Sequence, residues 1–248
     1  MTKIFKKKGL FITGTDTGVG KTIVAAGLVK LARNKGLRAL AVKPVETGCT
    51  VRDGQLYPED GSFLHQASEG DLTLDECVPF RFSLPASPAR AAAAMGSSLH
   101  VTDLKEHVLA LAEDADLTVV EGAGGLMVPI QGNLMMIDLA KRLGFPTIIV
   151  ARSGLGTINH SLLTVNALKQ RGLEILGIVL SCSTPEPGPE EEFTPSDLAR
   201  LTEGIPVVVM PYLSPDMKSN PARIAETIVT IWPEEMLNRW LGCDNPGA

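Results

Sequence analysis

Short apolar runs alternate along the chain with longer segments in which apolar residues recur at helical spacing. The runs are apolar on both faces, which is typical of strands in a parallel sheet covered by helices on each side. The sequence predicts strands at Gly9–Thr13, Arg38–Val42, Asp116–Val120, Pro146–Ala151, Ile175–Leu180 and Ile205–Met210. Repeated alternation of strand and helix indicates an α/β fold with right-handed crossovers between parallel strands.

The segments between these strands predict the helices, which are Lys21–Lys35, Asp103–Glu113, Asp138–Leu143, Thr157–Gln170 and Pro195–Thr202. Turn signals that lead each interior helix back to the next strand are Gly36, Gly144, Gly172 and Gly204. The acidic segment Pro185–Pro195 is expected to be a solvated loop, because both its prolines and its charges oppose regular structure.

The composition fits one globular domain over residues 1–248, 44% of which are hydrophobic. A net charge of −5 argues against a nucleic-acid partner, which needs a basic surface. No run approaches the roughly 18 apolar residues of a membrane span. The basic residues Lys3, Lys6, Lys7 and Lys8 precede an apolar run too short for a signal peptide. Since the cysteines and histidines are scattered, we expect a cytoplasmic protein without a membrane partner.

The segment Gly14–Thr22 (GTDTGVGKT) ends like a phosphate-binding loop but departs from the usual pattern by one position, because Thr15 stands where glycine is expected. It nevertheless follows a predicted strand and opens a predicted helix, where backbone N–H groups bind phosphate. Lys21 can reach the outer phosphates, and the Thr22 hydroxyl can reach a magnesium ion. The sequence therefore predicts a P-loop NTPase-like parallel sheet with helices on both faces. Its expected ATP contacts in this segment are Gly18, Val19, Gly20, Lys21, Thr22 and Ile23.

Magnesium bound with a nucleotide needs carboxylates, and two are candidates. Glu121 stands at the end of a strongly apolar predicted strand and is followed by Gly122–Gly125. Ligands of parallel α/β sheets lie beyond the carboxyl ends of the strands, so Glu121 is expected to face the phosphates. Asp60 is a weaker candidate, because it stands in a polar stretch expected to be a loop, where acidic residues are usually only solvated.

Lys43 follows the strand Arg38–Val42 and precedes Pro44, which favours extended backbone at Lys43. It is therefore expected at the same edge of the sheet as Lys21. Two lysines, a metal ion and a nucleotide suit phosphoryl transfer, in which positioning and charge neutralisation supply most of the catalysis. A surface lysine at a strand end is an equally good interpretation of Lys43 from the residues alone.

Five segments together resemble those of the dethiobiotin synthetase family. They are GTDTGVGKT, VKPVETG (Val42–Gly48), SPARAA (Ser87–Ala92), VEGAGGLMVP (Val120–Pro129) and GLGTINHSLLT (Gly154–Thr164). They occur in order from Phe11 to about Leu213, over most of the chain. No single segment is unique to the family, but the set is specific.

The resemblance implies an ATP-dependent carboxylation in biotin synthesis. Members of this family convert 7,8-diaminononanoate, CO2 and ATP into dethiobiotin, ADP and phosphate. One amine captures CO2 as a carbamate, ATP phosphorylates the carbamate, and the second amine closes the ureido ring. The resemblance also implies a homodimer with its sites near the subunit interface.

The resemblance assigns roles to residues of this sequence. It implies that Lys21 and Lys43 steady the γ-phosphate and the carbamate. The positions that match magnesium-binding residues are Thr22, Asp60 and Glu121. Further residues implied to contact ATP are Asp60, Glu121, Gly122, Ala123 and Gly124. Thr47 matches a substrate-contacting hydroxyl position. The segment that would bind the substrate carboxylate from the partner chain includes Gly154, Leu155, Gly156, Thr157 and Asn159.

The region expected to contact the base departs from the family pattern. The family often carries Asn-Asp after the strand that is Ile175–Leu180 here, and its asparagine reads adenine. This chain carries Ser181 and Cys182 instead. The remaining residues implied to lie near the base are Pro211, Tyr212 and Leu213. The segment Pro185–Pro195 is also longer and more acidic than in the family.

Other proteins with a similar loop provide the alternatives. Partition-type ATPases, which act as nucleotide-dependent assembly switches, carry a signature lysine near the head of the loop, whereas this chain has Asp16. Cobyrinate amidases carry an additional glutaminase domain. Since a single domain is expected to occupy residues 1–248, no room is expected for such a domain in this chain. A nucleotide switch without enzymatic activity leaves VKPVETG and Gly154–Asn159 unexplained.

Overall fold

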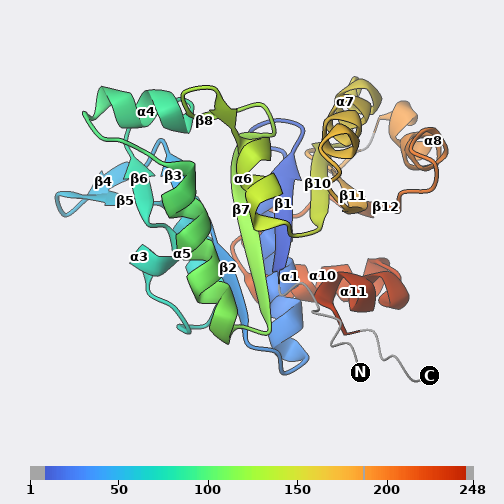
Figure 1. The fold of residues 1–248 in the computed structure, drawn as a ribbon. Helices are drawn as coiled ribbons and strands as arrows, with labels where there is room; N and C mark the ends of the chain where they lie inside the picture. Colours follow the sequence, from blue (N-terminus) through green and yellow to red (C-terminus); the bar gives the residue numbers. More distant parts are fainter. Residues whose placement is uncertain (1–8, 187, 244–248) are drawn as a thin grey trace, which may run out of the picture.

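A computed structural model of the chain describes residues 9–186 and 188–243 (Figure 1). Its centre is a six-stranded parallel sheet with the strand order β12-β11-β10-β1-β7-β2. The strands are β1 (Gly9–Gly14), β2 (Ala39–Val42), β7 (Leu117–Gly125), β10 (Thr147–Arg152), β11 (Ile175–Ser181) and β12 (Val207–Met210). The predicted α/β fold is confirmed. The predicted strand ends lie within two residues of those observed, except for β7, which extends to Gly125.

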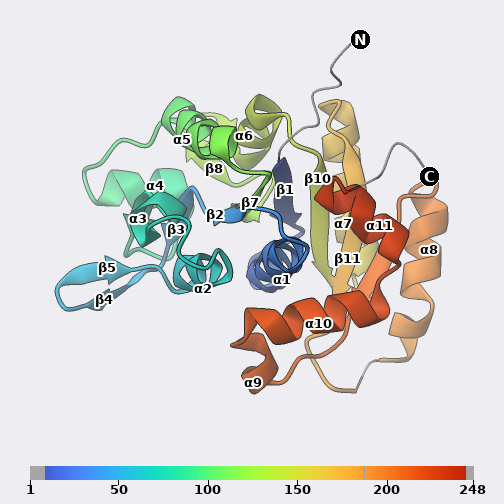
Figure 2. The same cartoon turned by 90° about the horizontal axis from the view of Figure 1, so that it is seen from below.

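Helices cover both faces of the sheet, as Figure 2 shows. One face packs against α1 (Lys21–Asn34), α2 (Glu59–Ala67), α10 (Pro221–Ile231) and α11 (Glu234–Leu241). The other packs against α4 (Pro88–Ala94), α5 (Val101–Asp114), α6 (Met136–Leu143), α7 (Thr157–Gln170) and α8 (Thr194–Leu201). Successive strand residues point to opposite faces, so Leu10 and Ile12 lie in one core and Phe11 in the other. This explains why the strands are apolar throughout.

Small elements that were not predicted surround the edge of the sheet beyond β2. They are β3 (Val45–Thr47), β4 (Thr50–Arg52), β5 (Gln55–Tyr57), α3 (Leu74–Cys77) and β6 (Phe80–Phe82). Strand β3 pairs with β6 in parallel, and β4 with β5 antiparallel. Elsewhere, β8 (Pro129–Gln131) pairs with β9 (Leu134–Met135), and α9 (Pro215–Lys218) precedes α10.

Two regions complete the comparison with the predictions. The expectation of a loop over Pro185–Pro195 is wrong in part, because Pro189–Glu192 forms a 3-10 helix and α8 begins at Thr194. Pro187 and the N-terminal residues Lys3, Lys6, Lys7 and Lys8 lie outside the described residues. Within the described ranges, no helix combines the length and apolarity needed to cross a membrane.

Candidate active site

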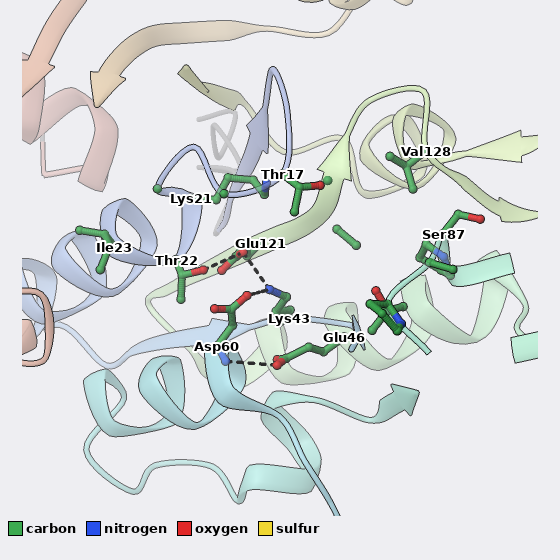
Figure 3. Close-up of a pocket in the computed structure, with 18 of the residues that line it drawn as sticks. Thr17, Lys21, Thr22, Ile23, Lys43, Glu46, Asp60, Ser87, Glu121 and Val128 are labelled. Carbon is green, nitrogen blue, oxygen red and sulfur yellow. Dashed lines mark hydrogen bonds and ion pairs between the residues drawn. The ribbon is translucent and has the colours of Figure 1, made fainter. Parts of the chain in front are cut away.

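A cavity of about 740 Å³ lies at the carboxyl ends of β1, β2 and β7 (Figure 3). The phosphate loop forms one wall, the start of α2 a second, and the region around α4 a third. Predicted site residues that line it are Gly18, Gly20, Lys21, Thr22, Ile23, Lys43, Thr47, Asp60, Glu121, Ala123 and Gly124. Carboxyl ends of parallel strands are where α/β proteins bind ligands, so this cavity is the candidate active site.

The loop between β1 and α1 leaves the first turn of α1 open to an anion. Gly20 occupies the N-cap position with φ 99°, and no side chain caps the helix. A Cβ at Gly20 would lie 2.8 Å from the Ser181 hydroxyl oxygen. Both the backbone conformation and the close approach therefore require glycine. The free N–H groups and the positive end of the helix dipole then favour a phosphate.

Lys21 points back over this loop. Its Nζ donates a 3.0 Å hydrogen bond to the backbone carbonyl oxygen of Asp16, and the side chain is buried. Burial lowers the pKa of Lys21, while the nearby Glu121 carboxylate opposes that shift. A buried cation next to free helix amides attracts the outer phosphates of a nucleotide strongly, because little water screens it.

Lys43 connects the two predicted carboxylates. Its Nζ lies 3.0 Å from Glu121 Oε1 and also donates a hydrogen bond to Asp60 Oδ2. Burial would lower the pKa of Lys43, but Glu121 and Asp60 outweigh burial and raise it above its ordinary value. Lys43 is therefore protonated at neutral pH and available to stabilise negative charge. Its buried environment is the observation that separates it from a solvated lysine at a strand end.

Oxygen ligands for a magnesium ion converge at the same place. The Thr22 hydroxyl donates a 3.1 Å hydrogen bond to Glu121 Oε1, while Glu121 Oε2 is buried without a hydrogen-bond partner among the described atoms. Within the described residues, no three His, Cys, Asp or Glu side chains form a self-contained metal site. Magnesium commonly uses one or two carboxylates together with substrate phosphates and water. The ligand set of Thr22, Glu121 and Asp60 fits that chemistry.

Two expectations about the local structure around these carboxylates are wrong. Asp60 is the second residue of α2 rather than part of a loop. Glu121 lies within β7 rather than at its end, because Gly122–Gly125 continue the strand and Gly125 pairs with Gly14 after a register shift in β1. Glycine is usually disfavoured in strands. Here the absence of side chains at Gly124 and Gly125 allows β7 to lie close to the phosphate loop.

Gly122, a predicted ATP contact, does not line this cavity, whereas some residues without a predicted role do. Gly122 faces the core, where a Cβ would lie 3.0 Å from Phe11 Cζ. Glu46, Ser87 and Pro88 line the cavity, although the sequence reasoning gave them no role. The signal for Ser87 and Pro88 was present in SPARAA, since Pro88 occupies the first turn of α4, a common helix start.

A smaller cavity of about 210 Å³ adjoins the other side of the phosphate loop. Predicted residues that line it are Gly18, Val19, Gly20, Ile23, Ser181, Cys182, Pro211 and Leu213. Tyr212 instead lines a neighbouring cavity of about 470 Å³, which Cys182 and Pro211 also border. Most of the residues predicted near the base therefore lie together beside the phosphate loop. Tyr212 is the exception, because it lines the neighbouring cavity instead.

The segment Gly154–Asn159 lies apart from both phosphate-loop cavities. It joins β10 to α7, and Gly156 is the N-cap of α7 with φ 89°. Leu155 is 89% exposed. None of the residues Gly154–Asn159 lines the candidate active site of the same chain.

Comparisons with known proteins identify the family. Residues 8–220 match a family described as an AAA domain. An ATP-dependent dethiobiotin synthetase of Anaeromyxobacter dehalogenans is 45% identical over 210 residues, which cover 85% of this chain and 92% of that protein. The corresponding protein of Thermodesulfovibrio yellowstonii is 36% identical over 239 residues, covering 93% and 98%. The chain belongs to the dethiobiotin synthetase family.

Solved structures extend the comparison to the fold alone. The septum site-determining protein MinD of Pyrococcus horikoshii has a TM-score of 0.52 at 19% identity, covering 94% of this chain and 92% of its own. A ParA family ATPase of Chlorobium tepidum has a TM-score of 0.54 at 14% identity, covering 94% and 95%. This chain therefore shares the overall fold of these two proteins, as expected of a P-loop NTPase-like parallel sheet with helices on both faces.

Proposed function

We propose that this chain is an ATP-dependent dethiobiotin synthetase that acts on 7,8-diaminononanoate and CO2. The observation that carries the proposal is family membership combined with the buried cluster of Lys43, Glu121 and Thr22 beside the phosphate loop. One substrate amine adds to CO2 and loses a proton, giving a carbamate. The carbamate oxygen attacks the γ-phosphorus of ATP and releases ADP. The second amine then displaces phosphate and closes the ring.

The side chains of the cavity have distinct tasks in this proposal. The amides of the α1 N-terminus and Lys21 hold the phosphates of ATP. Lys43, which lines the same cavity, stabilises the negative charge that grows during transfer. Thr22, Asp60 and Glu121 would hold magnesium, which would neutralise phosphate charge when bound. Thr47, on β3, binds the substrate near Lys43.

The contacts of Asp16 favour this function over a partition-type switch. Asp16 Oδ1 accepts a 2.7 Å hydrogen bond from the Thr17 N–H, and Oδ2 lies 2.9 Å from Arg152 Nη2. A carboxylate held by these contacts cannot supply the positive charge of the signature lysine. We also propose that the enzyme is a single-domain cytoplasmic homodimer without a nucleic-acid or membrane partner.

The test of the proposed function is whether turnover of ATP depends on both other substrates. Purified protein should release ADP and form dethiobiotin only when diaminononanoate and bicarbonate are supplied together. Mass spectrometry of the product and a coupled ADP assay measure the two outputs. Rapid ATP hydrolysis without diaminononanoate, and no dethiobiotin with it, would instead favour a nucleotide switch.

Removing either predicted metal-binding carboxylate should increase the magnesium requirement. Asp60→Asn and Glu121→Gln keep the side-chain shape but remove the negative charge. Because losing even indirect support of a metal typically costs 10–100-fold, we expect the half-maximal magnesium concentration to rise at least about tenfold. Activity measured against magnesium concentration at saturating ATP gives this value.

Asp53→Asn and Glu59→Gln are the controls for this experiment. Asp53 lies in the turn between β4 and β5, where asparagine tolerates its positive φ of 50°. Glu59 stands next to Asp60 but pairs with Arg52 on the surface. Both controls should keep the wild-type magnesium requirement. If Asp60→Asn behaves like them, Asp60 does not bind magnesium and Glu121 acts without it.

Nucleotide choice should be relaxed in this member of the family. A side-chain amide can donate to and accept from adenine, a pairing worth about 1–3 kcal/mol in base discrimination. Ser181 has a single hydroxyl, which lies against the phosphate loop at Gly20, and Cys182 is a weak hydrogen-bonding group. We therefore expect GTP or CTP to support kcat/KM within about 100-fold of ATP.

The measurement is kcat/KM for each nucleotide at saturating diaminononanoate and bicarbonate. Most of the binding energy comes from the triphosphate, which presents the same groups whatever the base. Discrimination of about 10,000-fold would match a dedicated hydrogen-bonding site. Such a result would show that other groups, such as the backbone of Pro211–Leu213, read adenine.

A further inference from the structure

Glu46 is a buried carboxylate in the wall of the candidate active site. It lies on β3, only 5% exposed, between the Lys43 side chain and the start of α2 (Figure 3). Its Oε1 accepts a 3.1 Å hydrogen bond from the backbone N–H of Asp60, and its Oε2 a 2.8 Å hydrogen bond from that of Gly61. Both carboxylate oxygens therefore bind the first turn of α2.

These hydrogen bonds supply a cap that α2 does not have from its own sequence. The N-cap residue is Pro58, and no side chain from that position bonds the helix. The first N–H groups of a helix need acceptors, and the positive end of its dipole favours a carboxylate. Glu46 meets both needs from a different element, and so it fixes the N-terminus of α2 to β3.

The space around this contact is closed. A Cβ on Gly61 would lie 2.0 Å from Val78 Cγ2 and 3.2 Å from Glu46 Oε2. Only glycine allows the helix to approach the Glu46 carboxylate this closely while Val78 packs behind it. Val78 is fully buried, so the helix start cannot shift away from Glu46 without opening the core.

The contact has a direct effect on Asp60. The residue whose backbone N–H binds Glu46 is also the residue whose carboxylate binds Lys43. The Asp60 side chain is half-exposed, so its own burial does little to hold it. The backbone anchor to Glu46 limits the directions in which that carboxylate can point.

Several groups around the Glu46 carboxylate favour its charged form. Burial raises the pKa of Glu46, while Lys43 and the two N–H groups of α2 oppose that shift. Glu46 is also one of the carboxylates that raise the pKa of Lys43, after Glu121 and Asp60. The charge of Glu46 thus favours the protonated form of Lys43.

We propose that Glu46 is a positioning residue that holds Asp60 in the direction needed to bind magnesium and Lys43. The proposal rests on the proposed function, because it concerns the metal and the catalytic lysine of that reaction. Glu46 acts through the first turn of α2, where both of its carboxylate oxygens accept hydrogen bonds from backbone N–H groups.

The test is a double-variant cycle of Glu46→Gln and Asp60→Asn, read as the gain in ATP affinity on adding magnesium. Isothermal titration calorimetry with and without magnesium gives this gain without requiring turnover. In Glu46→Gln, one hydrogen bond to α2 remains, but the charge is lost and the amide NH2 faces an N–H group. We expect the gain to fall by about 10–100-fold, as is typical when support of a metal ligand is removed.

The decisive expectation concerns the double variant. If Glu46 acts only through Asp60, Glu46→Gln in the Asp60→Asn background should change the gain by less than about twofold, the usual error of additivity. A purely structural role would instead lower the thermal midpoint and leave the affinity gain of the folded protein unchanged. The affinities report only folded protein, so partial unfolding does not imitate the expected result.

Three outcomes would overturn the proposal. In the first, Glu46→Gln keeps the wild-type gain in ATP affinity on adding magnesium. In the second, the losses caused by the two single substitutions multiply in full in the double variant. In the third, Asp60→Asn does not change the gain in ATP affinity. Glu59→Gln serves as the matched control, since it removes a carboxylate from the same turn of α2 at a surface position. If the wild-type protein binds ATP and magnesium but makes no dethiobiotin, the proposed function fails while the cycle still tests Glu46.

Discussion

Lys43→Ala should lower kcat by roughly 100- to 1000-fold, the usual loss when one donor to a charge that develops in the transition state is removed. The ammonium group is buried and held by Glu121 and Asp60, so its charge is fixed before the substrate binds. Such preorganised charge acts on the transition state more than on the ground state. Binding of ATP, which is expected to depend on the phosphate loop and Lys21, should change little.

The measurement combines kcat at saturating substrates with ATP affinity from calorimetry. Removing Lys43 leaves Glu121 buried without its cation, so the thermal midpoint should also fall, and rates must be expressed per folded enzyme. Lys169→Ala is the matched control, because Lys169 forms an ion pair with Glu203 on the surface. A near-normal kcat in Lys43→Ala would remove Lys43 from the catalytic residues.

The parts of the fold that the sequence predicted are those set by local pattern. Strands apolar on both faces and helices of regular period identified the six-stranded sheet, because burial between two layers imposes that composition. The phosphate loop was predictable for the same reason, since Gly20, Lys21 and Thr22 follow one strand directly and open one helix. Each of these features depends on neighbouring residues.

The parts that the sequence did not predict depend on distant contacts. Helix α2 has a proline at its N-cap, and its cap is Glu46 from β3. No local signal reports that contact, so Asp60 was expected in a loop. The glycines after Glu121 read as a loop for a similar reason. They continue β7 only because Gly125 pairs with Gly14 of β1 across a register shift.

Some missed elements did carry a local signal. Helix α10 begins with Pro221 in its first turn, and Asn220 Oδ1 accepts a hydrogen bond from the Ala222 N–H. Asparagine at the N-cap followed by proline is a typical helix start. Ile224 and Ile228 then repeat at the spacing of one apolar helix face. The sequence after residue 213 therefore carries the signal of helix α10, although no helix was predicted there.

The second prediction with a large expected effect is that each active site is shared between two chains. Gly154–Asn159 was predicted to bind the substrate carboxylate of a partner chain, and it lies apart from the cavity of its own chain. The N-terminus of α7 has no side-chain cap, and Leu155 beside it is 89% exposed. A helix N-terminus on the surface can bind a carboxylate brought by a second copy of the chain.

If the site is shared, the protein should sediment as a dimer, and dilution to monomer should abolish turnover. Sedimentation velocity and specific activity measured over the same concentration range test this directly. An inactive monomer is expected because neither chain alone would bind both ends of the substrate. A specific activity that stays constant while the dimer dissociates would refute the shared site.

Mixing two inactive variants tests the sharing itself. Lys43→Ala removes the cation proposed to act in catalysis, and Gly156→Asp places a carboxylate where the substrate carboxylate would bind. A Cβ at Gly156 has no atom closer than 4.0 Å, but the φ of 89° is strained for any side chain, so the activity of Gly156→Asp is expressed per folded enzyme and its thermal midpoint is measured alongside. In a mixed dimer, one site carries both changes and the other carries neither. Random exchange of subunits in a two-fold dimer should therefore restore about a quarter of wild-type activity. If each chain holds a complete site, the mixture should show no activity beyond that of its two parents.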